Sequence, residues 1–164
     1  MNSVKDTQKA RIVDYQPEYQ EAFKTINEEW IATYFQLEEE DRKLLNDPTK
    51  YIIDNGGAIL IAIIQDEPVG TCALIPMDDP LYKLELGKMG VLPKARGKGV
   101  GELLGRAIIQ KAKELGAETV YLESNSILQP AINLYRKLGF KEVTNHQSPY
   151  SRCNIQMAIN ISET

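Results

Sequence analysis

Residues 93–105, with the sequence PKARGKGVGELLG, limit the folds open to this chain more than any other stretch. Four glycines and three basic residues follow an extended run at 82–91 and precede a run of helical periodicity at 100–115. The pattern predicts a strand, a basic glycine loop and a helix. A helix N-terminus offers unpaired N–H groups and a partial positive charge, and glycines allow close approach to the backbone. The loop at 96–101 therefore predicts a cradle for an anion, and its length and charge favour a pyrophosphate.

The remaining sequence predicts a mixed α/β fold in the order β, α, α, β, β, β, α, β, α, β, β. The middle strand–helix–strand unit implies a right-handed parallel crossover, whereas alternating apolar residues near both ends indicate antiparallel strands. A mixed sheet with helices on both faces follows. In the first helix, core positions are expected at Phe23, Ile26, Trp30 and Tyr34. Strands are expected at 10–15, 57–64, 69–75, 82–91, 118–123, 140–144 and 152–161, and helices at 17–35, 38–46, 100–115 and 130–138.

Composition narrows the function classes. The 164 residues predict one domain, 1–164, with a frayed tail at 1–9. The net charge of −4 argues against a nucleic-acid partner, and no apolar run is long enough for a membrane span. Two distant cysteines and one histidine lack metal-ligand spacing, so no metal is expected. The cysteine usage and the lack of an apolar N-terminal segment predict a cytoplasmic location.

The glycine loop has three competing interpretations before any family is considered. The first is a loop that only turns the chain. A P-loop needs Ser or Thr after its lysine, but Gly99 follows Lys98. A dinucleotide fold is a minor alternative, because GVGELLG at 99–105 is close to its fingerprint and Glu123 ends the next strand as a ribose-binding acid does. That motif opens directly off its strand, whereas about seven residues intervene here.

Two motifs carry a family resemblance. The run VLPKARGKGVG at 91–101 resembles the acetyl-CoA signature of the GNAT N-acetyltransferases, Arg/Gln-x-x-Gly-x-Gly/Ala. The run AINLYRKLGF at 131–140 is similar to that family's second motif, Ala-x-x-Leu-Tyr-x-x-x-Gly-Phe. The resemblance covers 57–160 closely and the N-terminal helices only in topology. It implies the GNAT fold, a mostly antiparallel sheet in which one parallel pair, ending near Val91 and Glu123, splays apart.

The resemblance also implies how acetyl-CoA binds. The co-substrate enters the gap between the splayed strands, and its pantetheine amides pair with backbone at Met89, Gly90 and Val91. Gly90 either forms a bulge at the splay point or only weakens the strand. Asn125 is a candidate for pantetheine or nucleotide binding and Asn133 is a second option, although Leu128 holds the position where the family often has its asparagine. The pyrophosphate site comprises Arg96, Gly97, Lys98, Gly99, Val100 and Gly101.

Acetyl transfer to an amine needs a base and an acid. Glu85 is the base candidate, because histone-modifying members of the family carry a catalytic glutamate at a similar place and a central strand desolvates a carboxylate. A solvent-facing glutamate is the alternative. Tyr135 is the acid candidate, since its counterpart in the family protonates the leaving sulfur. Its helical spacing fits a core tyrosine equally well.

The residues and the resemblance together predict an enzyme, an acetyl-CoA-dependent N-acetyltransferase. It would transfer the acetyl group directly to a primary amine of a small molecule or peptide. Both cysteines fall in apolar strand contexts, which argues against a cysteine nucleophile. A non-catalytic acyl-CoA-binding module of the same fold is the alternative, and a homodimer stays open. His146 is either a base acting through water or a solvated loop residue, and Tyr150 and Arg152 either bind a substrate carboxylate or cap an edge.

Overall fold

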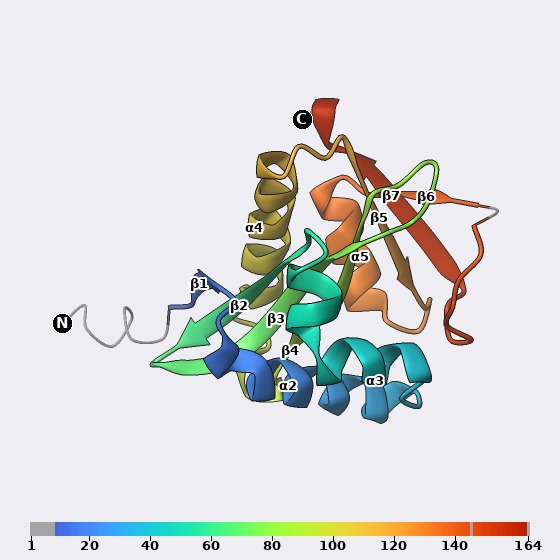
Figure 1. Ribbon diagram of the computed structural model, residues 1–164. Helices are drawn as coiled ribbons and strands as arrows, with labels where there is room; N and C mark the ends of the chain where they lie inside the picture. The colour runs from blue at the N-terminus through green and yellow to red at the C-terminus, as the bar shows by residue number, and fades with distance from the viewer. Residues whose placement is uncertain (1–8, 145, 164) are drawn as a thin grey trace.

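The computed structural model describes residues 9–144 and 146–163, so the expected tail at 1–9 lies outside the description except for Lys9. Its centre is a seven-stranded sheet in the order β1-β2-β3-β4-β5-β7-β6 (Figure 1). The element order agrees with the order expected from the sequence. The strands are β1 Arg11–Asp14, β2 Ala58–Ile64, β3 Glu67–Pro76, β4 Leu84–Val91, β5 Thr119–Ser124, β6 Lys141–Val143 and β7 Ile155–Asn160.

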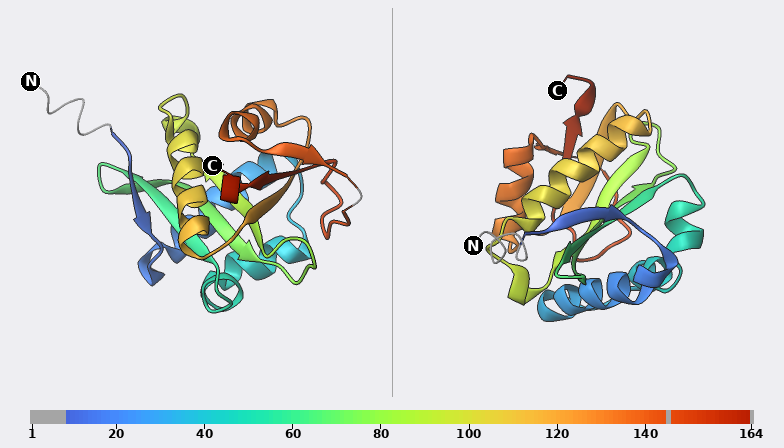
Figure 2. Two further views of the ribbon diagram at one scale, coloured as in Figure 1. Left: turned by 90° about the horizontal axis from the view of Figure 1, so that it is seen from above. Right: turned by 90° about the vertical axis from the view of Figure 1, so that its left-hand side faces the viewer.

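Helices cover both faces of the sheet, as the right-hand view of Figure 2 shows. The helices α2, Gln20–Tyr34, and α3, Glu39–Asn46, contribute to one hydrophobic cluster. The helices α4, Val100–Glu114, and α5, Gln129–Leu138, contribute to a second cluster. Short helical turns are η1 Pro17–Tyr19, η2 Thr49–Ile53, η3 Pro93–Ala95 and η4 Ile161–Glu163.

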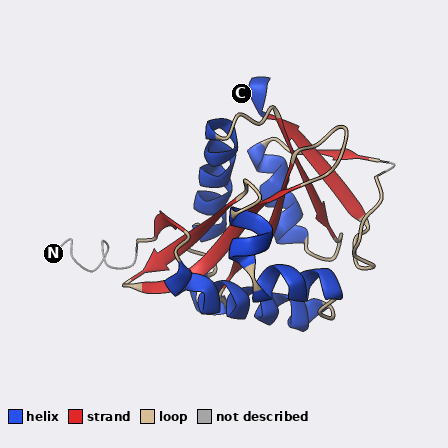
Figure 3. Cartoon of the chain, viewed as in Figure 1, coloured by secondary structure: helices blue, strands red, loops and turns tan. Residues whose placement is uncertain are grey.

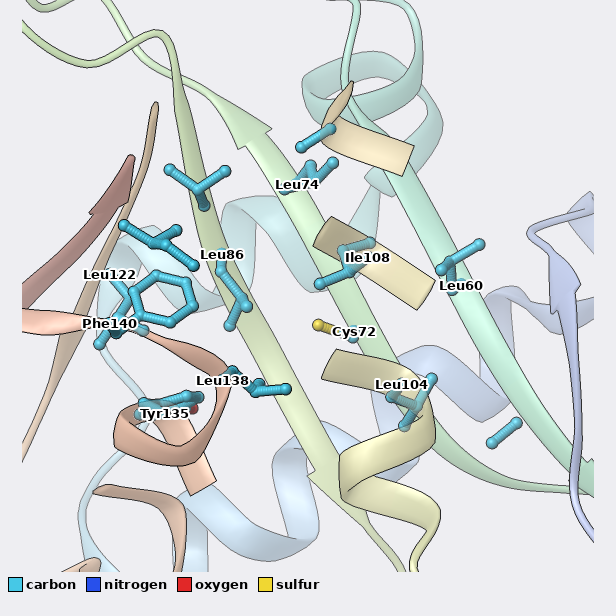
Figure 4. Packing of buried hydrophobic residues seen from close by; sticks show 14 of the residues in the cluster. Leu60, Cys72, Leu74, Leu86, Leu104, Ile108, Leu122, Tyr135, Leu138 and Phe140 are labelled. Atoms are coloured by element: carbon cyan, nitrogen blue, oxygen red, sulfur yellow. The ribbon is translucent and has the colours of Figure 1, made fainter. Parts of the chain in front are cut away.

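The strand β2 shows why the centre of the sheet has an almost continuous apolar sequence. Its residues Ile59, Ile61 and Ile63 belong to the cluster with α2 and α3, whereas Leu60 and Ala62 belong to the cluster with α4 and α5. Successive side chains of a strand point to opposite faces, so a strand covered on both faces needs apolar residues throughout. Figure 4 shows the second cluster, in which Leu104 and Ile108 of α4 lie over the side chains of the sheet.

One parallel pair interrupts the antiparallel sheet and positions the candidate site. The strands β4 and β5 are parallel, and they pair only at Glu85↔Tyr121 and Leu86↔Leu122. Beyond these pairs β4 continues to Val91, so the two strands separate, as the resemblance predicted. Figure 3 shows the three strands β5, β7 and β6 inclined away from the longer central strands. A dinucleotide fold would require several consecutive parallel strands, so this alternative is wrong.

Three local expectations differ from the structure. Tyr34 was expected in the core but is 48% exposed, and Trp30 is only partly buried. Both lie near the end of α2, where the helix reaches the cavity described below. The last strand begins at Ile155 rather than near 152, because a turn precedes it, in which the Cys153 N–H donates to the Tyr150 carbonyl (3.4 Å).

Candidate active site

A cavity of about 320 Å³ opens where β4 and β5 separate. Its floor is β4 from Glu85 to Val91, and its opposite wall is the end of β5 with the loop that follows. The end of α2 contributes an aromatic side, and the start of α5 contributes Pro130 and Ala131. The remaining wall comes from the segment between β6 and β7, through Tyr150, Arg152 and Cys153. Cys153 was expected to be buried, but it is half-buried at this wall.

The floor of the cavity carries a β-bulge. The ladder between β3 and β4 shifts register between Thr71↔Gly90 and Ala73↔Gly87, so β4 holds an extra residue there. Lys88 takes the unusual φ of +48°, which places the bulge at Lys88 rather than at the glycine expected to form it. Gly90 instead allows a close approach, because a Cβ atom at this position would lie 2.5 Å from the Trp30 ring.

A buried chain of hydrogen bonds holds the bulge against α2. The Trp30 indole donates to Asn27 Oδ1 (2.9 Å), and Asn27 Nδ2 donates to Thr71 Oγ1 (3.1 Å). The Thr71 hydroxyl donates to the backbone carbonyl of Lys88 (2.9 Å). Since Asn27 and Thr71 are fully buried, each unpaired group in this chain would be costly. These hydrogen bonds fix the backbone of β4 in the region where the pantetheine was expected to pair.

The glycine loop has the geometry of an anion cradle. Gly97 and Gly99 adopt φ of +79° and +77°, and a Cβ atom at either position would meet nothing within 4 Å. Gly99 is the N-cap of α4, where the left-handed conformation favours glycine. In the described part of the chain, no acceptor takes the backbone N–H groups of residues 97–102. These donors and the helix dipole suit a phosphate group.

The basic side chains of the loop differ in their surroundings. Arg96 lines the cavity, donates from Nε to the Val91 carbonyl (3.2 Å) and lies 3.7 Å from Glu29 of α2. Lys98 is exposed. Arg96 therefore links the loop to the floor of the cavity, while Lys98 is free to approach a bound anion.

Glu85 lies on the floor of the cavity and is partly buried. Burial raises its pKa to about 8, and the charge of Glu123 adds to the effect, while Lys88 opposes it. This agrees with the desolvation expected on a central strand and argues against a solvent-facing glutamate. A carboxyl group of this pKa exchanges protons near neutral pH.

Tyr135 lies in α5, lines the cavity and is 8% exposed. Its ring packs edge-on against Phe140, with the centroids 5.9 Å apart, and Figure 4 shows both rings in the cluster. Its hydroxyl group has no hydrogen-bond partner among the described residues, and burial raises its pKa. The residue therefore packs in the core through its ring and presents a protonated hydroxyl at the cavity.

The sequence analysis missed a buried charge cluster beside Glu85. Asp41 of α3 is fully buried and accepts hydrogen bonds from Lys88 (2.7 Å) and, through both oxygens, from Arg152 (2.6 and 2.7 Å). Burial alone would raise the pKa of Asp41, but the hydrogen bonds from Arg152 and the charge of Lys88 lower it to about 2. Lys88 also donates to the Tyr150 hydroxyl (3.1 Å). Lys88 and Arg152 are 47 and 111 positions from Asp41 in the sequence, so no local pattern could have revealed these contacts.

The remaining candidates lie in three different settings. Asn125 lines the cavity, but its side chain donates to the Arg152 carbonyl (2.7 Å) and accepts from the backbone of Ile127 (3.0 Å). Asn133 is exposed on α5 and does not line the cavity. His146 contacts Asp79 (2.7 Å) outside the cavity, which favours a structural role over that of a base.

The match to a family model follows this geometry. The model described as the acetyltransferase (GNAT) family matches residues 15–140. The chain belongs to the GNAT family of acetyltransferases. This confirms the resemblance found in the two motifs.

Individual relatives agree with this assignment. The chain is 33% identical over 102 residues to human N-acetyltransferase 8B, which covers 60% of this chain and 45% of the relative. It is 35% identical over 89 residues to the Escherichia coli N-acetyltransferase YjgM, covering 54% of this chain and 53% of the relative. The chain thus spans about half the length of these curated relatives.

Solved structures confirm the fold. A GNAT acetyltransferase of Staphylococcus aureus Mu50 superposes with a TM-score of 0.82 at 22% identity, covering 93% of this chain and 99% of that one. A Salmonella typhimurium protein solved with its cofactor acetyl-CoA gives a TM-score of 0.74 at 17% identity, covering 94% and 95%. Within residues 9–144 and 146–163, no helix has the length and apolarity needed to cross a membrane. The same residues contain no cluster of side chains suited to hold a metal ion.

Proposed function

We propose that this protein is an acetyl-CoA-dependent N-acetyltransferase that transfers the acetyl group directly to a primary amine of a small molecule or peptide. The observation that carries the proposal is the shared cavity, into which the backbone of β4, Glu85 and Tyr135 all open. The glycine loop lies beside it, since a Cβ atom on Gly101 would be 3.9 Å from Met89, a cavity-lining residue.

Each part of the cavity has a task in this reaction. The N–H groups of residues 97–102 bind the pyrophosphate of acetyl-CoA, with Arg96 and Lys98 adding positive charge. The splayed backbone of β4 from Met89 to Val91 pairs with the pantetheine. The ring of Tyr135 and the start of α5 exclude water from the reacting end. Asn125 and Asn133 stay predictions as cofactor contacts.

The proton transfers follow from the two titrating groups. The amine nitrogen attacks the thioester carbonyl, so that a C–N bond forms and the C–S bond breaks. Glu85 as a carboxylate takes the proton that the amine must lose, because its pKa of about 8 lies near neutral pH. Tyr135, whose raised pKa keeps its hydroxyl protonated, gives a proton to the departing sulfur.

A thiol-release assay with acetyl-CoA and a panel of amines tests the proposal. Wild-type protein should release CoA thiol only when an amine is present. Glu85→Gln should lower the rate by about 10²-fold or more at pH 7, and the deficit should shrink at high pH, where the amine is deprotonated without help. Glu142→Gln, on the exposed face of β6, is the matched control and should retain the wild-type rate.

Two outcomes would contradict this function. CoA binding without thiol release for any amine would make the protein a non-catalytic acyl-CoA-binding module. A Glu85→Gln variant as fast as wild type across the pH range would remove Glu85 from the reaction.

Three other expectations remain our proposals. Residues 1–164 are taken as one catalytic domain, and the cytoplasm is taken as its location because Cys72 and Cys153 are not joined. A homodimer stays open, and sedimentation of the purified chain would decide it.

A further inference from the structure

We propose that the acceptor is an amine with no carboxylate beside its amino group, and that Glu85 and Glu123 recognise it as a cation. This inference rests on the proposed acetyltransferase function and specifies the substrate class of the same cavity. Its basis is the distribution of paired and unpaired charges around the part of the cavity lined by Glu85, Glu123 and Arg152, which we call the acceptor end.

The cations at this end of the cavity are already neutralised. Lys88 and Arg152 resemble a receptor for a substrate carboxylate, as the sequence suggested for Arg152. Their side chains are only 4% and 13% exposed, however, and both donate to the fully buried Asp41. Glu38 lies 3.4 Å from Arg152 as well. Two carboxylates therefore balance two cations, and no positive charge is left over for an incoming anion.

The carboxyl groups of Glu85 and Glu123, which line the cavity itself, are not neutralised by an ion pair of this kind. Among residues 9–144 and 146–163, neither Glu85 nor Glu123 forms an ion pair. Glu123 accepts hydrogen bonds from the hydroxyls of Tyr121 and Ser148, both at 2.7 Å. Neutral hydroxyls hold a carboxylate in position but leave its charge in place. Glu123 therefore gives this end of the cavity an excess negative charge, and a cation bound there would favour ionisation of Glu85 as well.

The two carboxyl groups lie on one face of the sheet where the strands part. Glu85 is paired with Tyr121 across the parallel ladder, and Glu123 follows Tyr121 by two residues. Side chains two apart on a strand share a face, so Glu85 and Glu123 both face the side that carries α2 and α3. Two like charges close together in a desolvated site resist joint ionisation, and a bound ammonium group relieves that repulsion.

The end of α2 supplies the surface for the body of such an amine. Trp30, Tyr34 and Phe35 line the cavity, and Tyr150 faces them from the segment between β6 and β7. Tyr34 is half-exposed although it lines the cavity, so an apolar or aromatic substituent would cover it. A free carboxylate on the same molecule would meet Glu85 and Glu123 with no cation available, and would lose hydration without compensation.

Three acceptors with one aromatic body test this proposal in the thiol-release assay: 2-phenylethylamine, phenylalaninamide and phenylalanine. Wild-type protein should show kcat/KM at least about tenfold higher for each of the first two than for phenylalanine. The amide is a weaker base than phenylalanine and the simple amine is a stronger one, so basicity cannot explain a preference for both. If another amine proves the better acceptor, the comparison is repeated with its own carboxylated analogue.

Two variants separate recognition from chemistry. Glu123→Gln should reduce the preference over phenylalanine about tenfold, whereas the exposed Glu142→Gln should leave it unchanged. Asp41→Asn should move the preference toward phenylalanine by freeing Lys88 and Arg152. If that variant does not fold, Glu123→Gln alone decides the question.

The outcomes distinguish this proposal from the one on which it rests. No thiol release with any amine would overturn the proposed function itself. Turnover with phenylalanine at least equal to that with phenylalaninamide would overturn only the recognition of a carboxylate-free cation. An unchanged preference in Glu123→Gln would do the same.

Discussion

At the scale of single residues, the cavity and its surroundings depend on two kinds of side chain, those of a contiguous motif and those brought together by folding. Tyr135 lies in a contiguous family motif, so its place could be expected from ten residues of sequence. Asp41 lies in an acidic helix that resembles any solvated surface, yet it is fully buried. Its partners come from β4 and from the segment before β7. Long-range ion pairs of this kind have no local sequence signature, which is why the charge cluster was missed.

Tyr135 allows the packing role and the acid role to be separated. Tyr135→Phe keeps the ring against Phe140 and removes only the hydroxyl, which has no partner among the described residues. The free energy of unfolding should therefore change by less than about 1 kcal/mol. Turnover should fall by about 10²-fold if the hydroxyl protonates the leaving sulfur. Urea unfolding and steady-state rates measure the two effects.

The same variant has an internal control in the choice of acyl donor. A thioester whose thiol is more acidic needs less help from an acid, so the defect of Tyr135→Phe should be smaller with that donor. A variant as fast as the wild type with acetyl-CoA, where chemistry limits the rate, would leave Tyr135 with packing alone.

At the scale of elements, periodicity and turn residues predicted the helices and strands, because each pattern is local. The runs at 82–91 and 100–115 became β4 and α4 with small changes at their ends. The bulge in β4 could not be located from the sequence. The bulge depends on Thr71 in the neighbouring strand. The Thr71 hydroxyl accepts a hydrogen bond from the Asn27 side chain and donates one to the backbone carbonyl of Lys88. The sequence left open whether Gly90 forms a bulge or only weakens the strand, whereas the structure shows that the Trp30 ring leaves no room for a Cβ atom at this position.

Two glycines that flank the helix α4 form a matched pair that tests the cradle. Gly99 at its start has φ of +77° and Gly116 beyond its end has φ of +82°, and neither Cβ position has a neighbour within 4 Å. Replacement by alanine should thus cost a similar 1–2 kcal/mol or so of backbone strain at either end. Only Gly99→Ala should weaken CoA binding, by about tenfold or more, because it alone disturbs the phosphate-binding donors. Calorimetric titration with CoA measures this, and equal affinities of the two variants would contradict the cradle.

At the scale of the whole molecule, the fold and the family could be predicted because two motifs and an element order are enough to identify them. The acceptor end of the cavity could not be predicted from the sequence, because its residues come from separate segments, which include α2, both splayed strands and the segment before β7. The charges gathered there also affect the stability of the folded chain. Asp41 stabilises the fold through two cations, and its contribution should be lost only as the pH falls from 3.8 toward about 2. Glu85 has the opposite effect, because its pKa is raised by folding.

Glu85 should therefore make the protein less stable as the pH rises toward 8. The unfolded chain releases this proton near pH 4.5, whereas the folded protein holds it to about pH 8. Between these values the folded state binds one more proton, so the free energy of unfolding should decrease by up to about 1.4 kcal/mol per pH unit. Glu85→Gln removes the titrating group, so this variant should lose that slope and be more stable than wild type at pH 8, at the cost of activity. Urea unfolding of the two proteins and of Glu142→Gln at pH 5, 6.5 and 8 measures the difference. Parallel pH profiles for wild type and Glu85→Gln would mean that Glu85 is ionised in the folded protein, and that the cavity does not raise its affinity for a proton.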